Sequence, residues 1–179
     1  ISLLSFASVL LLTLLIFEVD RKFDADKLRI GSKLKWHTVG VTLYSYIVVY
    51  TGALVRHTDS GLICPDWPLC NNDQFSLPSN MYEWVQMGHR TAAALIFIWI
   101  AFIAWHAVKN YKDQRVLYYG WITAFIIVSL QVISGMVVVL TKLNLYFALV
   151  HSLLISLLFG LLCYMILLLS RSRSNKTQK

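Results

Sequence analysis

Two histidines lie within long, mainly apolar stretches of the chain. His89 occurs in EWVQMGHRTAAAL, with Gly88 before it and Ala92 and Ala93 about one turn later, so a broad flat group could lie against this face. His151 occurs in FALVHSLLIS, within another apolar stretch. Imidazole is a common ligand of metals, but a single histidine in an apolar helix is about as often hydrogen-bonded to a neighbouring helix. The positions of the two rings in the fold decide whether they are metal ligands or hydrogen-bonding residues.

The composition is typical of an integral membrane protein. The chain has 179 residues, of which 58% are hydrophobic and only 14% charged, and its mean hydropathy is +0.63. Apolar stretches recur to the end of the chain, so a signal peptide does not explain them. The net charge of +7 comes from basic residues between these stretches, which argues against a nucleic-acid partner and for contact with membrane lipid.

Five apolar stretches are predicted to form helices that cross all or most of a bilayer, because about 20 helical residues span its hydrocarbon core. They are 1–17, 36–55, 84–107, 116–140 and 145–169. The predicted fold is an all-α integral membrane protein, with a four-helix transmembrane bundle over 36–169 and one flanking N-terminal transmembrane helix. Residues 1–17 would be the last part of a helix that starts upstream, 18–35 a cytoplasmic basic loop and 170–179 a disordered cytoplasmic tail.

Lysine and arginine collect in 18–35, near residue 110 and in 170–179. By the positive-inside rule these segments face the cytoplasm, so we expect a multi-pass plasma membrane protein with a cytoplasmic C-terminus. The longest connection, which contains GLICPDWPLC, is then expected on the extracellular side.

In such a bundle the stretches 84–107 and 145–169 run in the same direction and stand diagonally opposite. His89 and His151 lie about five and six residues below the outer ends of these helices, which corresponds to about 8 to 9 Å of depth for both. Diagonal helix axes are on the order of 13 Å apart, a gap that two imidazoles cannot bridge by touching. An iron in the plane of a porphyrin fills this gap, so the pair is predicted to bind one haem as axial ligands.

Small residues near the two histidines are predicted to leave room for this haem, although small residues also serve ordinary helix contact in membranes. They are Gly52, Gly135, Ala148 and Ser152. Arg90, directly after His89, is predicted to bind a haem propionate by a charge-assisted hydrogen bond, with extension to the outer headgroups as the alternative.

The other three histidines are weaker candidates. His37 and His106 lie at the predicted cytoplasmic ends of helices and are assigned to the membrane interface. His57, just beyond an outer helix end, could contact a propionate or carry a proton, but a solvated loop residue is the simpler interpretation.

The outer connection contains two cysteines six residues apart, Cys64 and Cys70. Their predicted extracellular position favours a disulfide, which would shape a lid over the outer edge of the haem. A metal site is less favoured because two thiols without a second pair do not complete a tetrahedral ligand set, and a redox-active pair stays open. Cys163, deep in the last helix, is interpreted as a small apolar filler.

The segments TGALVRHTDSGLICPDWPLC, EWVQMGHR and ALVHS together resemble the haem A synthase family, in particular the C-terminal half of the Bacillus-type enzyme. The resemblance covers essentially the whole chain. It implies a protein of eight spans in two similar four-helix halves. Members of the family oxidise a ring methyl of haem O to the formyl group of haem A, for the terminal oxidase.

Carried over by position, the resemblance makes His89 and His151 the axial ligands of a haem b cofactor and joins Cys64 to Cys70. The family's catalytic glutamate lies in the N-terminal half, three residues before a ligand histidine. Here Gln86 stands at that spacing from His89, and an amide cannot act as a base. We therefore expect no catalytic residue in this chain, and expect the reacting half upstream of Ile1.

The leading hypothesis is thus the cofactor-binding part of an oxidoreductase enzyme, which alone would lack the catalytic half. The resemblance implies haem O as the substrate of the other half, haem O synthase (a farnesyltransferase) as a possible partner, and an electron acceptor that the sequence does not identify. The alternatives are a bis-histidine b-type membrane cytochrome, and a non-enzymatic helical bundle whose histidines are only hydrogen-bonded.

Overall fold

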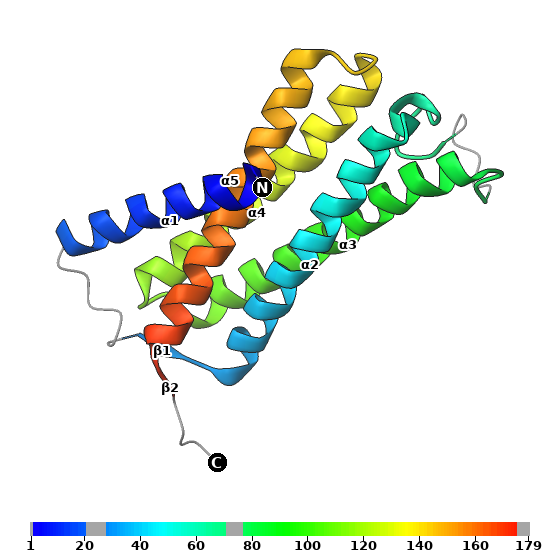
Figure 1. The fold of residues 1–179 in the computed structure, drawn as a ribbon. Helices are drawn as coiled ribbons and strands as arrows, with labels where there is room; N and C mark the ends of the chain where they lie inside the picture. Colours follow the sequence, from blue (N-terminus) through cyan, green and yellow to red (C-terminus); the bar gives the residue numbers. More distant parts are fainter. Residues whose placement is uncertain (1, 21–27, 71–76, 175–179) are drawn as a thin grey trace.

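A computed structural model describes residues 2–20, 28–70 and 77–174, and it confirms the helical membrane fold (Figure 1). Four helices are long and apolar enough to cross a membrane. They are α2 (Ser32–His57), α3 (Met81–Asn110), α4 (Arg115–Leu140) and α5 (Leu145–Arg171). The remaining elements are helix α1 (Ser2–Asp20), the 3-10 turn η2 (Ser60–Leu62) and two short strands, β1 (Arg29–Ile30) and β2 (Arg173–Ser174).

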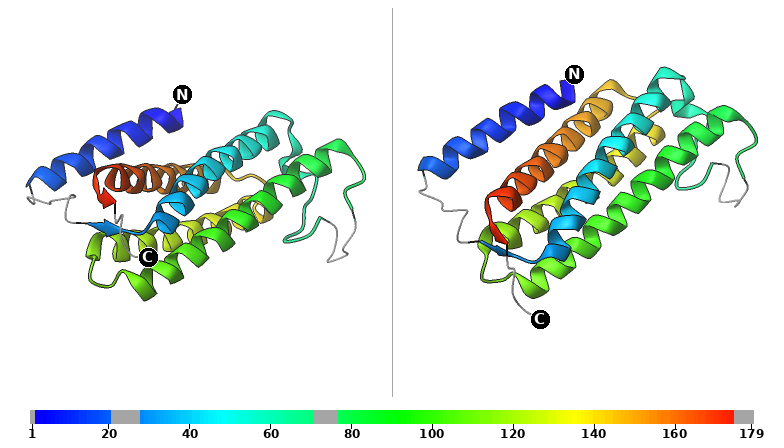
Figure 2. Two further views of the ribbon diagram at one scale, coloured as in Figure 1. Left: turned by 90° about the horizontal axis from the view of Figure 1, so that it is seen from below. Right: turned by 60° about the horizontal axis from the view of Figure 1, so that its bottom comes forward.

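The four long helices form the predicted up-and-down bundle. α2 packs against α3 and α5, and α4 packs against the same two helices, so α3 and α5 are diagonal to each other (Figure 2). Short connections join α3 to α4 and α4 to α5, and a longer one joins α2 to α3, so consecutive helices pack against each other and run antiparallel. We call α2 with α3, and α4 with α5, the two hairpins of the bundle. The helices that carry His89 and His151 therefore run in the same direction on opposite sides of the bundle.

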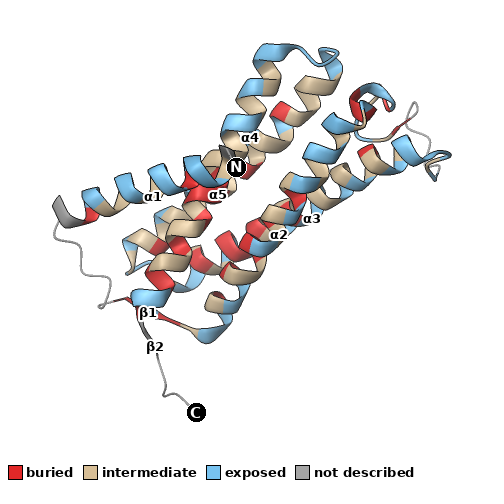
Figure 3. Cartoon of the chain, viewed as in Figure 1, coloured by how far each residue is buried: buried red, intermediate tan, exposed pale blue. Residues whose placement is uncertain are grey.

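The apolar core fills only the half of the bundle next to β1 and β2, which we call the inner half. Its fully buried apolar residues on the four helices lie within 34–48, 96–107, 117–128 and 158–169. The outer segments 49–57, 81–95, 129–140 and 145–157 contribute no fully buried apolar side chain, and most of their residues are half-buried or exposed (Figure 3). The four helices thus pack tightly on one side of the two histidines and loosely around them.

Helix α3 begins three residues earlier than its apolar stretch indicates. The Asn80 side chain accepts a hydrogen bond from the Glu83 N–H, and the Glu83 carboxylate accepts from the Ser79 N–H and hydroxyl. This arrangement resembles a capping box, except that Glu83 binds the N–H of Ser79, the residue before the cap; it satisfies the Glu83 N–H, which the first turn would otherwise leave free. The sequence carried a signal for this helix start, an asparagine followed three residues later by a glutamate.

Helix α1 lies beside the four-helix bundle and packs against α5 (Figure 2). Gly160 lets it approach closely, because a Cβ atom there would lie 2.5 Å from Leu10 Cδ2. Near the inner end the buried Glu18 carboxylate accepts a hydrogen bond from the Tyr164 hydroxyl and pairs with Arg171 at 2.6 Å. The apolar part of α1 is shorter than the four spans above, so its crossing of the membrane stays a prediction.

The segments before and after the bundle are joined by a short parallel pairing that the sequence did not predict. Arg29 of β1 lies opposite Arg173 of β2, and the Gln114 side chain binds both the N–H and the carbonyl of Arg29. The predicted disordered tail is therefore wrong for 173–174, since strand pairing orders them. The sequence showed no sign of these strands, because two residues are too few to show an alternating pattern. Residues 21–27 of the predicted loop and 175–179 of the predicted tail lie outside the described residues.

Candidate functional site: two histidines in the outer half of the bundle

His89 is held within the α2–α3 hairpin. Its Nδ1 lies 2.9 Å from the Thr51 hydroxyl oxygen, and the same hydroxyl donates to the Val48 carbonyl at 2.7 Å. The ring also packs over Gly52, where a Cβ atom would be only 2.9 Å from His89 Cε1. A threonine and the glycine after it therefore fix the position of the ring from the neighbouring helix.

His151 is held in the same manner within the α4–α5 hairpin. Its Nδ1 lies 2.9 Å from the Ser134 hydroxyl oxygen, which donates to the Gln131 carbonyl, and its Nε2 lies 3.1 Å from Gln131 Nε2. A Cβ atom at Gly135 would lie 3.1 Å from His151 Cε1. The two histidines thus have equivalent surroundings on diagonal helices.

Two of the small residues have a contact that the sequence did not predict, while the room that all four would leave for a haem stays a prediction. Gly52 and Gly135 accommodate the imidazole rings themselves, since a side chain at either position would press on the ring. Ser152 is exposed and its hydroxyl donates to the Ala148 carbonyl of its own helix. Sequence spacing placed the glycines near the right depth but could not show which group they contact.

The surroundings of the two rings suit a large, mainly apolar ligand with a metal. Both rings lie in the outer half of the bundle, beyond the end of the packed apolar core. Around them the outer segments bury no apolar residue completely, and the buried Gln131 Oε1 atom has no hydrogen-bond partner. Within 2–20, 28–70 and 77–174 no three histidine, cysteine or acidic side chains cluster as a protein-only metal site would require. A metal held here must bring further ligands of its own.

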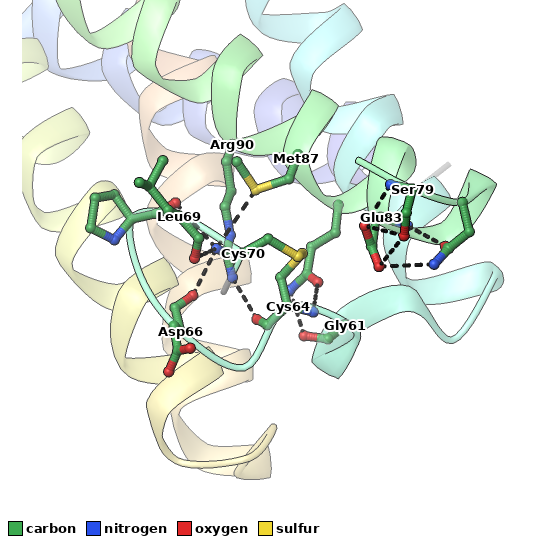
Figure 4. Close-up of a disulfide and its surroundings, with 12 residues drawn as sticks. Gly61, Cys64, Asp66, Leu69, Cys70, Ser79, Glu83, Met87 and Arg90 are labelled. Atoms are coloured by element: carbon green, nitrogen blue, oxygen red, sulfur yellow. Dashed lines mark hydrogen bonds between the residues drawn. A yellow bond between two sulfur atoms is a disulfide. The ribbon is translucent and has the colours of Figure 1, made fainter. Parts of the chain in front are cut away.

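Cys64 and Cys70 form a disulfide, as predicted (Figure 4). Gln86 binds the backbone of the loop that contains them. Gln86 is 3% exposed; its Oε1 accepts from the Cys64 N–H at 2.7 Å and its Nε2 donates to the Gly61 carbonyl at 2.8 Å. An amide accepts and donates at once, whereas an ionised carboxylate could not make both contacts. The side chain three positions before His89 therefore holds the loop backbone, and the lack of a catalytic residue in this chain stays a prediction.

Arg90 also binds the disulfide loop. Its guanidinium donates to the backbone carbonyls of Cys64, Asp66, Pro68 and Leu69. The partners expected for Arg90 from the sequence were a haem propionate or the outer headgroups, but not the loop carbonyls. A lone arginine in a sequence gives no signal for contacts with backbone carbonyls. The propionate contact stays a prediction.

The remaining histidines lie away from the two rings. Trp99 donates its indole N–H to His37 Nδ1 at 3.2 Å, and His106 contacts Asn110 within its own helix. His57 is the exposed last residue of α2. His57 therefore ends the helix rather than lying beyond it, and the interfacial roles of His37 and His106 stay predictions.

Opening the disulfide should loosen the loop without unfolding the bundle. We expect Cys64→Ser with Cys70→Ser to lower the stability of the loop by about 2 kcal/mol, the chain-entropy value for so short a ring. Limited proteolysis of purified protein should show cleavage between residues 58 and 80 in the variant at protease concentrations that leave the parent intact. Equal cleavage of both would mean that Gln86 and Arg90 alone hold the loop.

The fold and this site define a class, multi-pass helical membrane proteins that present two histidines from diagonal helices to the bundle interior. The chain matches the profile of the COX15-CtaA family, described as cytochrome oxidase assembly protein, over residues 2–163, and it belongs to that family.

Curated relatives agree with this assignment. The chain is 72% identical to a protein named "Heme A synthase" from Lysinibacillus sphaericus (strain C3-41), over 100% of this chain and 59% of that protein. It is 57% identical to the protein of that name from Macrococcus caseolyticus (strain JCSC5402), over 97% and 58%, and 58% identical to that from Geobacillus kaustophilus (strain HTA426), over 97% and 54%. The chain therefore spans somewhat more than half the length of these relatives, and it corresponds to their C-terminal part.

Proposed function

We propose that this chain is the cofactor-binding part of a haem A synthase and that it holds one haem b between His89 and His151. The observation that carries this proposal is the pair of equivalently held imidazoles on diagonal parallel helices, in the half of the bundle that lacks a packed apolar core. The loosely filled outer half of the four-helix bundle would offer apolar side chains to the edges and faces of a porphyrin. The two imidazoles, from opposite sides, would bind its iron.

The residues present fit such a cofactor. The imidazoles supply the two axial ligands, the half-buried apolar side chains of the outer segments can bury themselves against the macrocycle, and the unpartnered Gln131 Oε1 is available to a polar substituent. Bound in this way, a haem supplies one-electron transfer. The protein's own contribution is to hold the rings in place and to close the outer end of the bundle with the disulfide loop.

The oxidation itself is assigned to the rest of the protein. The relatives are named "Heme A synthase", and the proposal extends their activity, the conversion of haem O to haem A by oxidation of a ring methyl to formyl, to the protein that contains this chain. Gln86 is occupied by the loop backbone, which leaves the helix turn before His89 without a free base. The proposed partners are haem O, haem O synthase as its source, and an electron acceptor of unassigned identity.

The proposed orientation puts the loop outside the cell and the C-terminus in the cytoplasm of a plasma membrane protein. The disulfide supports it, because such bonds persist on the oxidising side of the membrane. The inner end of the bundle carries the basic residues that the positive-inside rule assigns to the cytoplasm. Those described there are Arg29, Lys33, Lys35, Lys109, Lys112, Arg115 and Arg171.

The test uses protein expressed from the complete gene in a host that makes haem O but no haem A. Extraction of its haems, followed by chromatography, should show haem A only when the protein is present, and the purified protein should have the spectrum of a low-spin haem. A low-spin haem without haem A would favour the second candidate, a b-type electron-transfer cytochrome, which the occupied Gln86 also suits. Protein without haem would reject both.

A further inference from the structure

The same two-residue motif holds both histidines. On α2 it is Thr51–Gly52 and on α4 it is Ser134–Gly135; in each case the hydroxyl contacts Nδ1 of a histidine on the following helix and the glycine lies under Cε1. We propose that Thr51 and Ser134 are positioning residues that fix both imidazoles with Nδ1 protonated, so that each presents Nε2 to the haem iron. The inference rests on the proposed function, because it assigns how that site binds its cofactor.

The direction of each hydrogen bond follows from counting protons at the hydroxyl. Thr51 has a single hydroxyl hydrogen, and it donates this hydrogen to the Val48 carbonyl at 2.7 Å. It can therefore only accept from His89 Nδ1, which must carry the proton. In a neutral imidazole the other nitrogen, Nε2, then keeps the free lone pair that a metal requires.

At His151 two independent contacts give the same answer. Ser134 donates its hydrogen to the Gln131 carbonyl at 2.9 Å, so it accepts from His151 Nδ1. The Gln131 side-chain nitrogen, which can only donate, faces His151 Nε2 at 3.1 Å. The nitrogen that accepts from Gln131 is thus the one that the Ser134 contact leaves unprotonated, and a haem iron would replace the Gln131 amide at this Nε2.

The glycines complete the positioning. Cε1 lies between the two ring nitrogens, so the contact of Gly52 and Gly135 with Cε1 limits how far each ring can tilt. Ligand histidines commonly donate their second ring N–H to a protein acceptor, which fixes the tautomer and raises the basicity of the coordinating nitrogen. In each hairpin the hydroxyl of the preceding helix, from Thr51 or Ser134, is this acceptor.

Other hydroxyls in the bundle show that the contact is not a general consequence of helical threonine or serine. Thr38, on the same helix as Thr51 and fully buried, donates its hydroxyl hydrogen to the Leu34 carbonyl, and among the described residues no histidine contacts this hydroxyl. Ser129 donates to the Phe125 carbonyl in the same way on α4. These two residues are matched controls for Thr51 and Ser134.

The variants are Thr51→Val, Ser134→Ala and the double variant, in protein from the complete gene, with Thr38→Val and Ser129→Ala as controls. Loss of a partner of this kind costs about 10- to 100-fold in metal affinity, and we expect about 10-fold for each neutral hydroxyl. Haem affinity is measured by titrating haem-depleted protein. The double variant Thr51→Ser with Ser134→Thr, which keeps both hydroxyls, should bind as the parent does.

A second measurement separates positioning from mere packing. A weaker hydrogen bond at Nδ1 makes the ligand less basic and so favours ferrous iron, which should raise the midpoint potential of the low-spin haem in both hydroxyl-free variants but not in the controls. Unchanged affinity and potential in the double hydroxyl-free variant would overturn the inference while leaving the haem site intact. If His89→Ala and His151→Ala also bound haem as the parent does, the proposed function would be the part at fault.

Discussion

His89→Ala and His151→Ala, made in protein from the complete gene, are each expected to abolish the low-spin spectrum of the haem proposed here. Either change removes one of the two proposed axial ligands, and the described residues contain no cluster of three histidine, cysteine or acidic side chains that could hold a metal instead. The remaining imidazole alone would leave a five-coordinate, weakly held iron, so the purified variants should contain little or no haem at this site. Reduced-minus-oxidised spectra and the haem content per chain measure both effects.

The matched controls for these variants are His37→Ala and His57→Ala. Both remove an imidazole from the same helix, α2, but His37 contacts Trp99 near the inner end and His57 is exposed at the outer end. We expect the parental spectrum from both. Loss of haem in His57→Ala would instead revive the possibility that this residue contacts a propionate, and low-spin haem in both ligand variants would contradict the proposed site.

Gln86→Glu is expected to have the largest effect on the outer loop. The carboxylate lacks the amide hydrogens that bind the Gly61 carbonyl, and it would face that carbonyl as a buried negative charge. Leaving a buried acceptor without its donor costs about 1 to 3 kcal/mol, more where a charge is involved, so we expect a loss of about 3 kcal/mol in local stability. The rate at which a mild reductant opens the Cys64–Cys70 disulfide in detergent should rise by about 100-fold, as this free energy requires.

Gln114→Glu is the control that isolates burial. Gln114 makes the same pair of contacts, accepting from the Arg29 N–H and donating to the Arg29 carbonyl, each at 2.8 Å, but at an exposed site. Water can donate to the Arg29 carbonyl in place of the lost amide, so the disulfide should be reduced at the same rate as in the parent protein. Similar rates in Gln86→Glu and the parent would show that Arg90 is sufficient to hold the loop.

The sequence was sufficient for the features that depend on long-range patterns. Apolar stretches of span length, most of them separated by short connections, predict the four helices α2, α3, α4 and α5, their order, and the diagonal position of α3 and α5. The expected depth of His89 and His151 follows from their place in those stretches. Two cysteines in one loop were enough to predict their bond. Each of these depends on spacing along one element or on connection length.

What the sequence did not reveal depends on which side chains meet between elements. The contacts of Thr51 with His89 and of Ser134 with His151 join residues on different helices, and hydroxyl residues are too common in membrane helices to single them out. Arg90 showed the same difficulty, because its partners are backbone carbonyls that no residue type marks. The helix cap at Asn80 was a local signal that went unused.

Each histidine is oriented by the helix that directly precedes its own, so ring orientation is complete within a single hairpin. The packed core joins the two hairpins in the inner half of the bundle, so a change in their separation in the outer half would leave each ring aligned on its own hairpin. The precision of ring placement then depends on two local contacts rather than on the exact fit of all four helices.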